Sequence, residues 1–248
     1  MPGSMRRDAM LSKPEPFIGR LARIGLILVV GCVGLAWGGL NAKRGAASDV
    51  FRDIESHLLR FETFSPATAA ATLDGVAVQR LSGCDTHAQR ALLLLEIPLA
   101  YASLQSGAVQ EFDQRSRSLD ARARQTLSCN PRDSFVWLVL FGLSTGRGLV
   151  DENSFDLLRM SYETSPYEAW VAARRVTVAV PLILSAPAPL RERILAEFQY
   201  LVQKRFTEMP VRAYLNAPPA VRTLLQASVD QLGAKEKEAF AAALKRLS

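Results

Sequence analysis

Residues 84–129 read CDTHAQRALLLLEIPLAYASLQSGAVQEFDQRSRSLDARARQTLSC, and this stretch decides the fold class. Its first half places apolar residues at helical spacing up to about Leu104. The Ser106-Gly107 pair breaks the pattern, and a second helix is expected over about 109–128. The apolar positions of the first helix are Ala88, Ala91, Leu92, Leu95, Leu99 and Ala102. The stretch therefore predicts two antiparallel helices joined by a tight turn.

Cys84 and Cys129 stand at the two open ends of this predicted hairpin. The turn lies midway between them, so the arms are equal and both cysteines fall at the same end, within reach of a disulfide. A bridge there would place the domain in an oxidising compartment. Two unrelated buried thiols are the alternative. Pro98 is expected to kink the first arm, because its ring removes a backbone hydrogen bond.

Helical patterns continue on both sides of the hairpin. An amphipathic helix is expected from an N-cap at Ser48-Asp49 to about Leu59. Ser65-Pro66 has the character of another helix start, and the alanine-rich stretch that follows reads as helix or loop. The last helix, Lys235–Leu247, turns one apolar face inward and is expected to cap the domain. The sequence thus predicts an all-α chain.

Residues 24–40, IGLILVVGCVGLAWGGL, form the one long apolar run. A helix of this length spans about 26 Å, close to the hydrocarbon thickness of a bilayer. We predict a transmembrane signal anchor at 24–41, a cytoplasmic basic tail at 1–23, juxtamembrane helices and a linker at 42–83, and a helical-repeat domain at 84–248. The alternatives are a signal peptide cleaved at the weak site Gly45-Ala46-Ala47 and a helix buried in a soluble core.

The positive charge of the chain is concentrated around this run. The formal net charge is +6, and residues 1–44 hold seven basic and two acidic residues against 23 and 22 in the rest. This distribution is typical of the flanks of a membrane span and argues against a nucleic-acid partner. Together with the cysteine pair it predicts a single-pass bacterial inner-membrane protein with a cytoplasmic N-terminus and a periplasmic domain.

Residues that carry catalysis or hold cofactors form no recognisable pattern. His57 and His87 have no clustered ligands, and the glycine-rich phosphate-binding motifs are missing from the sequence. Asp151-Glu152 reads as a helix N-terminus. We therefore expect no catalytic residue, no metal, no cofactor and no enzymatic activity.

Arg174 and Arg175 are the candidate partner-binding residues. They are adjacent on one predicted helix, so their side chains cannot share a face. One arginine is expected to pair with a carboxylate inside the fold. The other is expected to face a groove that a partner occupies.

A weak internal repeat follows the hairpin. Pro131 and Pro166 each precede a helix and stand 35 residues apart, and Trp137 and Trp170 stand 33 apart. A proline at a helix start followed by a tryptophan, recurring near 34 residues, is typical of degenerate tetratricopeptide (TPR) repeats. The equivalent tryptophans are expected in the hairpin core rather than stacked on sugars.

The segments LSCNPRDSFVWL (127–138) and SYETSPYEAWVAARR (161–175) resemble the periplasmic TPR-like accessory proteins of bacterial exopolysaccharide and O-antigen gene clusters. The resemblance implies an α-solenoid that binds protein partners near an inner-membrane polysaccharide polymerase, ligase or export complex. A scaffold is therefore the first function class. A glycan-binding or enzymatic domain that no motif reveals is the second, and a structural subunit of a membrane complex is the third.

Overall fold

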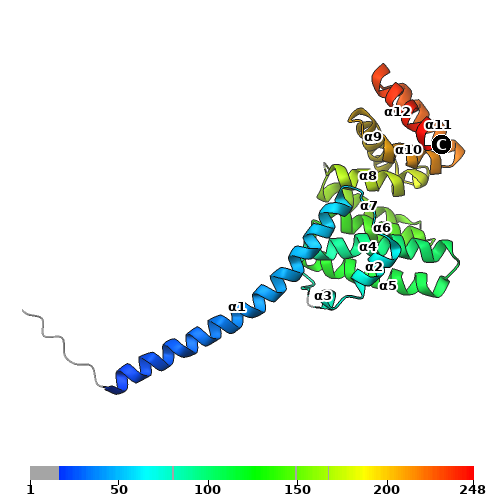
Figure 1. Ribbon diagram of the computed structural model, residues 1–248. Coiled ribbons are helices and arrows are strands. Elements are labelled where there is room, and N and C mark those ends of the chain that lie inside the picture. Colours follow the sequence, from blue (N-terminus) through cyan, green and yellow to red (C-terminus); the bar gives the residue numbers. More distant parts are fainter. Residues whose placement is uncertain (1–16, 80, 149, 167) are drawn as a thin grey trace, which may run out of the picture. The chain divides into compact units, whose positions relative to one another are not determined.

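The computed structural model describes residues 17–79, 81–148, 150–166 and 168–248, and these residues contain helices and no strand (Figure 1). The predicted all-α class is confirmed. The helices are α1 (Phe17–Leu59), α2 (Pro66–Leu73), α3 (Val76–Gln79), α4 (Thr86–Gln105), α5 (Val109–Cys129), α6 (Ser134–Gly146), α7 (Glu152–Thr164), α8 (Ala169–Ala179), the 3₁₀ turn η1 (Val180–Leu182), α9 (Ala188–Gln203), α10 (Glu208–Asn216), α11 (Pro219–Asp230) and α12 (Ala234–Leu247).

The chain divides into two compact units, residues 1–46 and 47–248. α1 contributes to both, and it passes without a break through the place where a new helix was expected. The predicted N-cap at Ser48-Asp49 is therefore wrong. No proline stops α1 before this point, and the Ser48 hydroxyl donates a hydrogen bond to Asp85 instead of capping its own helix.

Within the described residues, no helix combines the length and the apolar character needed to cross a membrane. The anchor predicted at 24–41 falls in α1 and stays a prediction. Residues 1–16 of the predicted cytoplasmic tail lie outside the part of the chain that the structure describes.

In the 47–248 unit, helices that are consecutive in sequence pack against each other. α4 lies on α5, α5 on α6, α6 on α7, and α8 on α9, while α10 packs across α8. One large cluster of buried apolar side chains runs through these helices from Leu58 to Ala243. The last helix contacts α9, α10 and α11, as expected of an element that covers the end of the domain.

Short polar side chains set where four of the helices begin. Ser65, Asp85, Asp133 and Asp151 are the N-caps of α2, α4, α6 and α7, and each accepts a hydrogen bond from a backbone N–H in the first turn. Such caps satisfy donors that have no partner inside the helix. The predicted start at Ser65-Pro66 and the capping role of Asp151 are thus confirmed.

The α4–α5 hairpin agrees closely with the predicted bounds. α4 continues as a helix on both sides of Pro98. Its end is set by Gly107, which has a φ of +76° that glycine adopts without steric cost. The N–H of Ala108 reaches back to the Ser103 carbonyl at 2.9 Å, and this bond turns the chain into α5.

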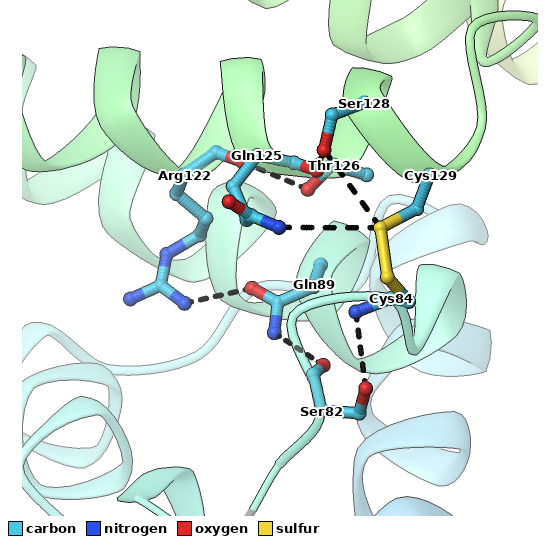
Figure 2. The surroundings of a disulfide bond; sticks show 8 residues. All are labelled: Ser82, Cys84, Gln89, Arg122, Gln125, Thr126, Ser128 and Cys129. Carbon is cyan, nitrogen blue, oxygen red and sulfur yellow. Dashed lines mark hydrogen bonds between the residues drawn. A yellow bond between two sulfur atoms is a disulfide. The ribbon is translucent and has the colours of Figure 1, made fainter.

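The two cysteines meet at the open end of this hairpin, as predicted (Figure 2). Cys84 and Cys129 form a disulfide, with Cα atoms 5.4 Å apart. Gln89 holds the loop before α4 by donating to the Ser82 carbonyl at 2.9 Å, and Arg122 on α5 donates to Gln89 at 2.9 Å. The bridge therefore closes a loop of 45 residues whose ends are also joined by hydrogen bonds.

Replacing Cys84 with Ser should lower the free energy of unfolding by about 3–4 kcal/mol, because the open chain regains the entropy that a closed loop of this length removes. Cys129→Ser should have the same effect, since either change removes the same bond. The measurement is thermal unfolding of the full chain under non-reducing conditions. Cys32→Ser is the matched control and should leave the melting temperature unchanged. Unequal effects of the two bridge variants would contradict the prediction.

Candidate functional site

A cavity of about 790 Å³ opens within the 47–248 unit. Its walls come from the end of α1 with the segment 61–64, from α2, α4, α5 and α6, and from α8 with η1. Most of its lining is aliphatic or aromatic, as Leu95, Leu138, Val139 and Leu182 illustrate. The volume lies in the range of about 300–1,000 Å³ that is typical of small-molecule sites.

Gly142 and Pro98 are two residues of the walls with no long side chain to occupy this space. At Gly142 on α6, an added Cβ would meet only the Val178 Cγ1 atom, at 3.9 Å. Pro98 on α4 also lines the cavity, and it has no N–H to offer the Leu94 carbonyl one turn earlier. Protein interiors are otherwise close-packed, with few voids larger than a water molecule. A cavity of this size is therefore a distinct feature of the core.

Arg174 supplies the positive charge at the wall of the cavity. Its guanidinium donates to the backbone carbonyls of Leu58 at 2.6 Å and Trp170 at 3.2 Å. It also lies over two aromatic rings, 4.2 Å from the centroid of Phe61 and 5.3 Å from that of Trp170. Among the described residues, no carboxylate forms an ion pair with it. Burial lowers the pKa of Arg174 to about 10, so the side chain remains charged at neutral pH.

The chain places Phe61 on this arginine by an unusual ending of α1. Phe61 has a φ of +62°, a conformation that glycine normally takes after a helix. Its N–H bonds the Leu58 carbonyl at 3.1 Å, and the N–H of Glu62 bonds the His57 carbonyl at 3.1 Å, which together form a Schellman cap. A bulky residue in this left-handed backbone conformation lowers the stability of the fold by about 1–2 kcal/mol. Strain of this kind is often found at functional sites.

Arg175 points the opposite way and is fully buried. It donates to Glu197 at 2.5 Å and to the Ser161 carbonyl at 2.8 Å, while the Tyr162 hydroxyl donates to Glu197 at 3.0 Å. Burial raises the pKa of Glu197, although Arg175 and Tyr162 both act against that shift. One arginine of the pair is thus bound to a carboxylate and the other lines a cavity, as expected. A partner-binding role for either remains a prediction.

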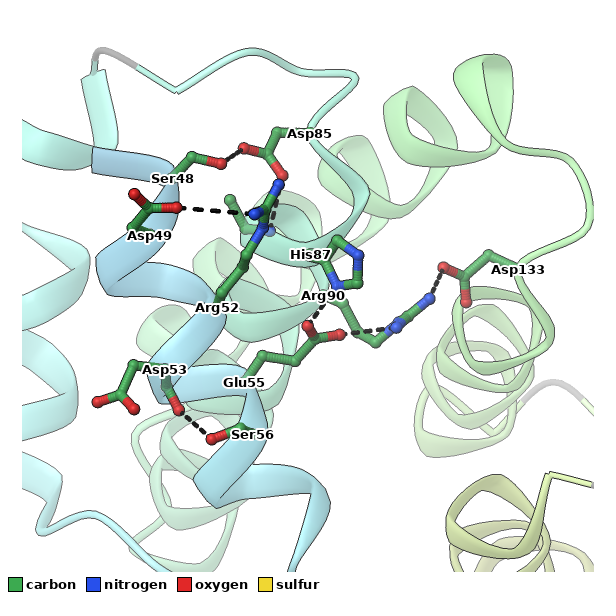
Figure 3. A network of polar contacts seen from close by, with 11 residues as sticks. Ser48, Asp49, Arg52, Asp53, Glu55, Ser56, Asp85, His87, Arg90 and Asp133 are labelled. Atoms are coloured by element: carbon green, nitrogen blue, oxygen red, sulfur yellow. Dashed lines mark hydrogen bonds and ion pairs between the residues drawn. The ribbon is translucent and has the colours of Figure 1, made fainter. Parts of the chain in front are cut away.

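A second polar cluster, formed by Glu55, His87, Arg90 and Asp133, fixes the end of α1 against the rest of the unit (Figure 3). Arg90 on α4 donates to Glu55 at 2.6 Å and to Asp133 at 2.8 Å, and His87 lies 2.6 Å from Glu55. Burial lowers the pKa of Arg90, but Asp133 and Glu55 outweigh it and leave the pKa raised. The cluster therefore holds the end of α1, the helix that ends at Leu59 just before Phe61.

The two histidines lie in separate polar contacts. His57 contacts Glu62 and lies 3.8 Å from Asp53 on the surface, whereas His87 belongs to the cluster around Arg90. In the part of the chain that the structure describes, no group of three His, Cys, Asp or Glu side chains could hold a metal ion. The described lining of the cavity contains neither His nor Cys. The arrangement can bind an apolar or amphiphilic molecule.

The cavity and most of the residues that shape it were not predicted from the sequence. Pro98 was interpreted only as a kink. The aromatic pair around Arg174 joins residues 61 and 170, so no local pattern could reveal it. The charged pair Glu55 and Arg90 is separated by 35 residues and was missed for the same reason. The Arg174-Arg175 dipeptide was the one signal that led to the site.

Comparisons with family models, curated proteins and solved structures found no match to this chain. The resemblance to TPR-like accessory proteins therefore stays a prediction.

Removing the buried carboxylate should destabilise the domain strongly. Glu197→Ala should lower the free energy of unfolding by about 3–5 kcal/mol, because it leaves the Arg175 charge buried without its counter-ion. The matched control is the triple variant Tyr162→Phe, Arg175→Met, Glu197→Leu, which removes the charges and the hydroxyl together. It should lose much less stability, as measured by urea unfolding followed by circular dichroism. An equal loss in both variants would show that packing, and not the unpaired charge, is responsible.

Proposed function

We propose that this chain is a membrane-tethered helical-repeat scaffold that binds a protein partner beside the membrane, in polysaccharide synthesis or export. The observation that carries the proposal is the stacking of successive helix pairs, α4–α5, α6–α7 and α8–α9, in chain order. Stacked helix pairs present extended surfaces, and such proteins act mainly as binding scaffolds. The pathway assignment comes from the resemblance of residues 127–138 and 161–175 to accessory proteins of polysaccharide gene clusters.

Contacts between repeat-equivalent positions support a solenoid. Ser134 at the start of α6 donates to Glu168 at the start of α8, at 3.0 Å and 34 residues away. Next to this bond, the rings of Phe135 and Trp170 lie 5.2 Å apart. The starts of α6 and α8 are thus in contact at a separation of 34 residues, close to the spacing of Pro131 and Pro166.

An exposed apolar patch is the surface we propose for the partner. It consists of Tyr101, Leu104 and Val109, which flank the α4–α5 turn and are 46%, 43% and 60% exposed. Exposed apolar groups gathered at one place commonly mark protein interaction sites. The patch lies at the opposite end of the hairpin from the disulfide, so partner binding there would leave the bridge undisturbed.

Partner capture tests this function. The tagged full chain is crosslinked in cells of its native source and purified from solubilised membranes. Membrane-bound glycosyltransferase, polymerase or export proteins should co-purify, and the variant Leu104→Glu, Val109→Glu should lose them because it places charges in the contact. Val76→Glu, at a 61% exposed position on α3, is the matched control. Bound sugar without a protein partner would instead favour a glycan-binding domain.

The proposed location is the bacterial inner membrane, with residues 45–248 in the periplasm. The apolar run at 24–40 with its basic flanks supports the anchor, and the disulfide supports an oxidising compartment. Alkaline phosphatase fused after Ser248 should therefore be active, because it needs an oxidising compartment to form its own disulfides. An inactive fusion on an intact, membrane-bound chain would overturn this topology.

A further inference from the structure

The cavity beside Arg174 has the size of a small-molecule site, and most of its lining is apolar. The cavity offers about 790 Å³. An alkyl chain is much thinner than a helix and can follow an irregular apolar space. The size and the apolar lining of the cavity therefore suit an elongated lipid-like molecule.

The charges at the cavity specify the polar end of such a molecule. Among the described residues that line the cavity, Arg174 and Glu62 are the charged ones. The Glu62 carboxylate is already bound by Arg60 at 2.8 Å and by His57, so it does not neutralise Arg174. A guanidinium has five N–H donors, and the bonds of Arg174 to two backbone carbonyls leave others for a ligand. The cavity is thus complementary to an anion with an apolar tail.

A carboxylate suits this site better than a phosphate. Arg pairs with a carboxylate through two parallel hydrogen bonds, and one positive charge balances one negative charge. A phosphate monoester carries close to two negative charges at neutral pH and needs a second cation. The described lining supplies no cation besides Arg174.

We propose that this cavity binds one long-chain fatty acid, with its carboxylate on Arg174 and its alkyl chain along the walls formed by α4, α6 and η1. The inference goes beyond the scaffold function, which uses the outer surface at the α4–α5 turn. Phe61 and Trp170 flank the guanidinium, hold its plane in place and shield the ion pair from water. The strained cap of α1 at Phe61 then serves to position the residue that binds the head group.

The test uses the full chain in phosphatidylcholine nanodiscs and a palmitic acid that carries a photoreactive diazirine in mid-chain. Adducts are mapped by peptide mass spectrometry after irradiation. They should fall on segments that line the cavity, namely 94–102, 138–146 and 177–182. The matched probe is the corresponding long-chain alcohol, which has the same tail without the charge.

Two variants separate the roles of charge and space. Arg174→Gln keeps a hydrogen-bond donor for the Leu58 carbonyl and should reduce labelling by the acid about tenfold, with little effect on the alcohol. Arg159→Gln, which removes an exposed arginine on α7, is its control. Gly142→Leu places a bulky side chain at the cavity wall and should reduce labelling by both probes, whereas Gly142→Ala fits the space beside Val178 and should not. Melting temperatures confirm that each variant is folded.

Several outcomes would overturn the proposal. Adducts confined to residues 17–46 would show that the acid only partitions with the apolar helix. Acid labelling that is insensitive to Arg174→Gln would show that the head group is not bound there. Exclusion of the probe by a crosslinked protein segment would assign the cavity to a partner. Tyr101 of the proposed partner surface also lines the cavity, but the partner-capture variant changes only Leu104 and Val109, which do not. The scaffold function and the fatty-acid site are therefore tested at different residues and can fail independently.

Discussion

Arg90 on α4 connects the elements that surround the cavity. It binds Glu55 from α1 and Asp133 at the N-cap of α6, and its guanidinium lies 5.4 Å from the Trp170 ring on α8. Both carboxylates are almost completely buried, so neither can exchange this partner for water. Removing the arginine would leave two desolvated charges without a counter-ion. The end of α1, and with it the aromatic cap over Arg174, depends on this interaction.

Arg174 and Arg175 are consecutive residues on α8, but their side chains have different surroundings. Consecutive residues on a helix point about 100° apart. Arg175 therefore points into the domain, where Glu197, Tyr162 and Ser161 satisfy it, while Arg174 points to the cavity and finds only backbone carbonyls and aromatic rings. The first arrangement fixes the packing of α7, α8 and α9. The second leaves a charge available to an incoming anion.

The cavity also requires the surrounding helices to be rigid, because an apolar void in a soft core would collapse. The disulfide limits the opening of the α4–α5 hairpin, and Arg90 fixes α4 against α1 and α6. Gly142, which has no side chain, and Pro98 both line the cavity. The helices α1, α4, α5 and α6, which these interactions join, all contribute to the cavity walls.

Most of the helices and the disulfide could be predicted from the sequence, because the signals for them are local. Apolar spacing and capping residues act within a few positions, and the Ser106-Gly107 turn midway between Cys84 and Cys129 was enough to bring the cysteines together. Tertiary structure decided the rest. α1 continues past Ser48, whose hydroxyl binds Asp85, 37 residues away. Side chains from distant helices decide which arginine is buried and whether an apolar space remains beside the other. Such long-range contacts leave no local pattern in the sequence.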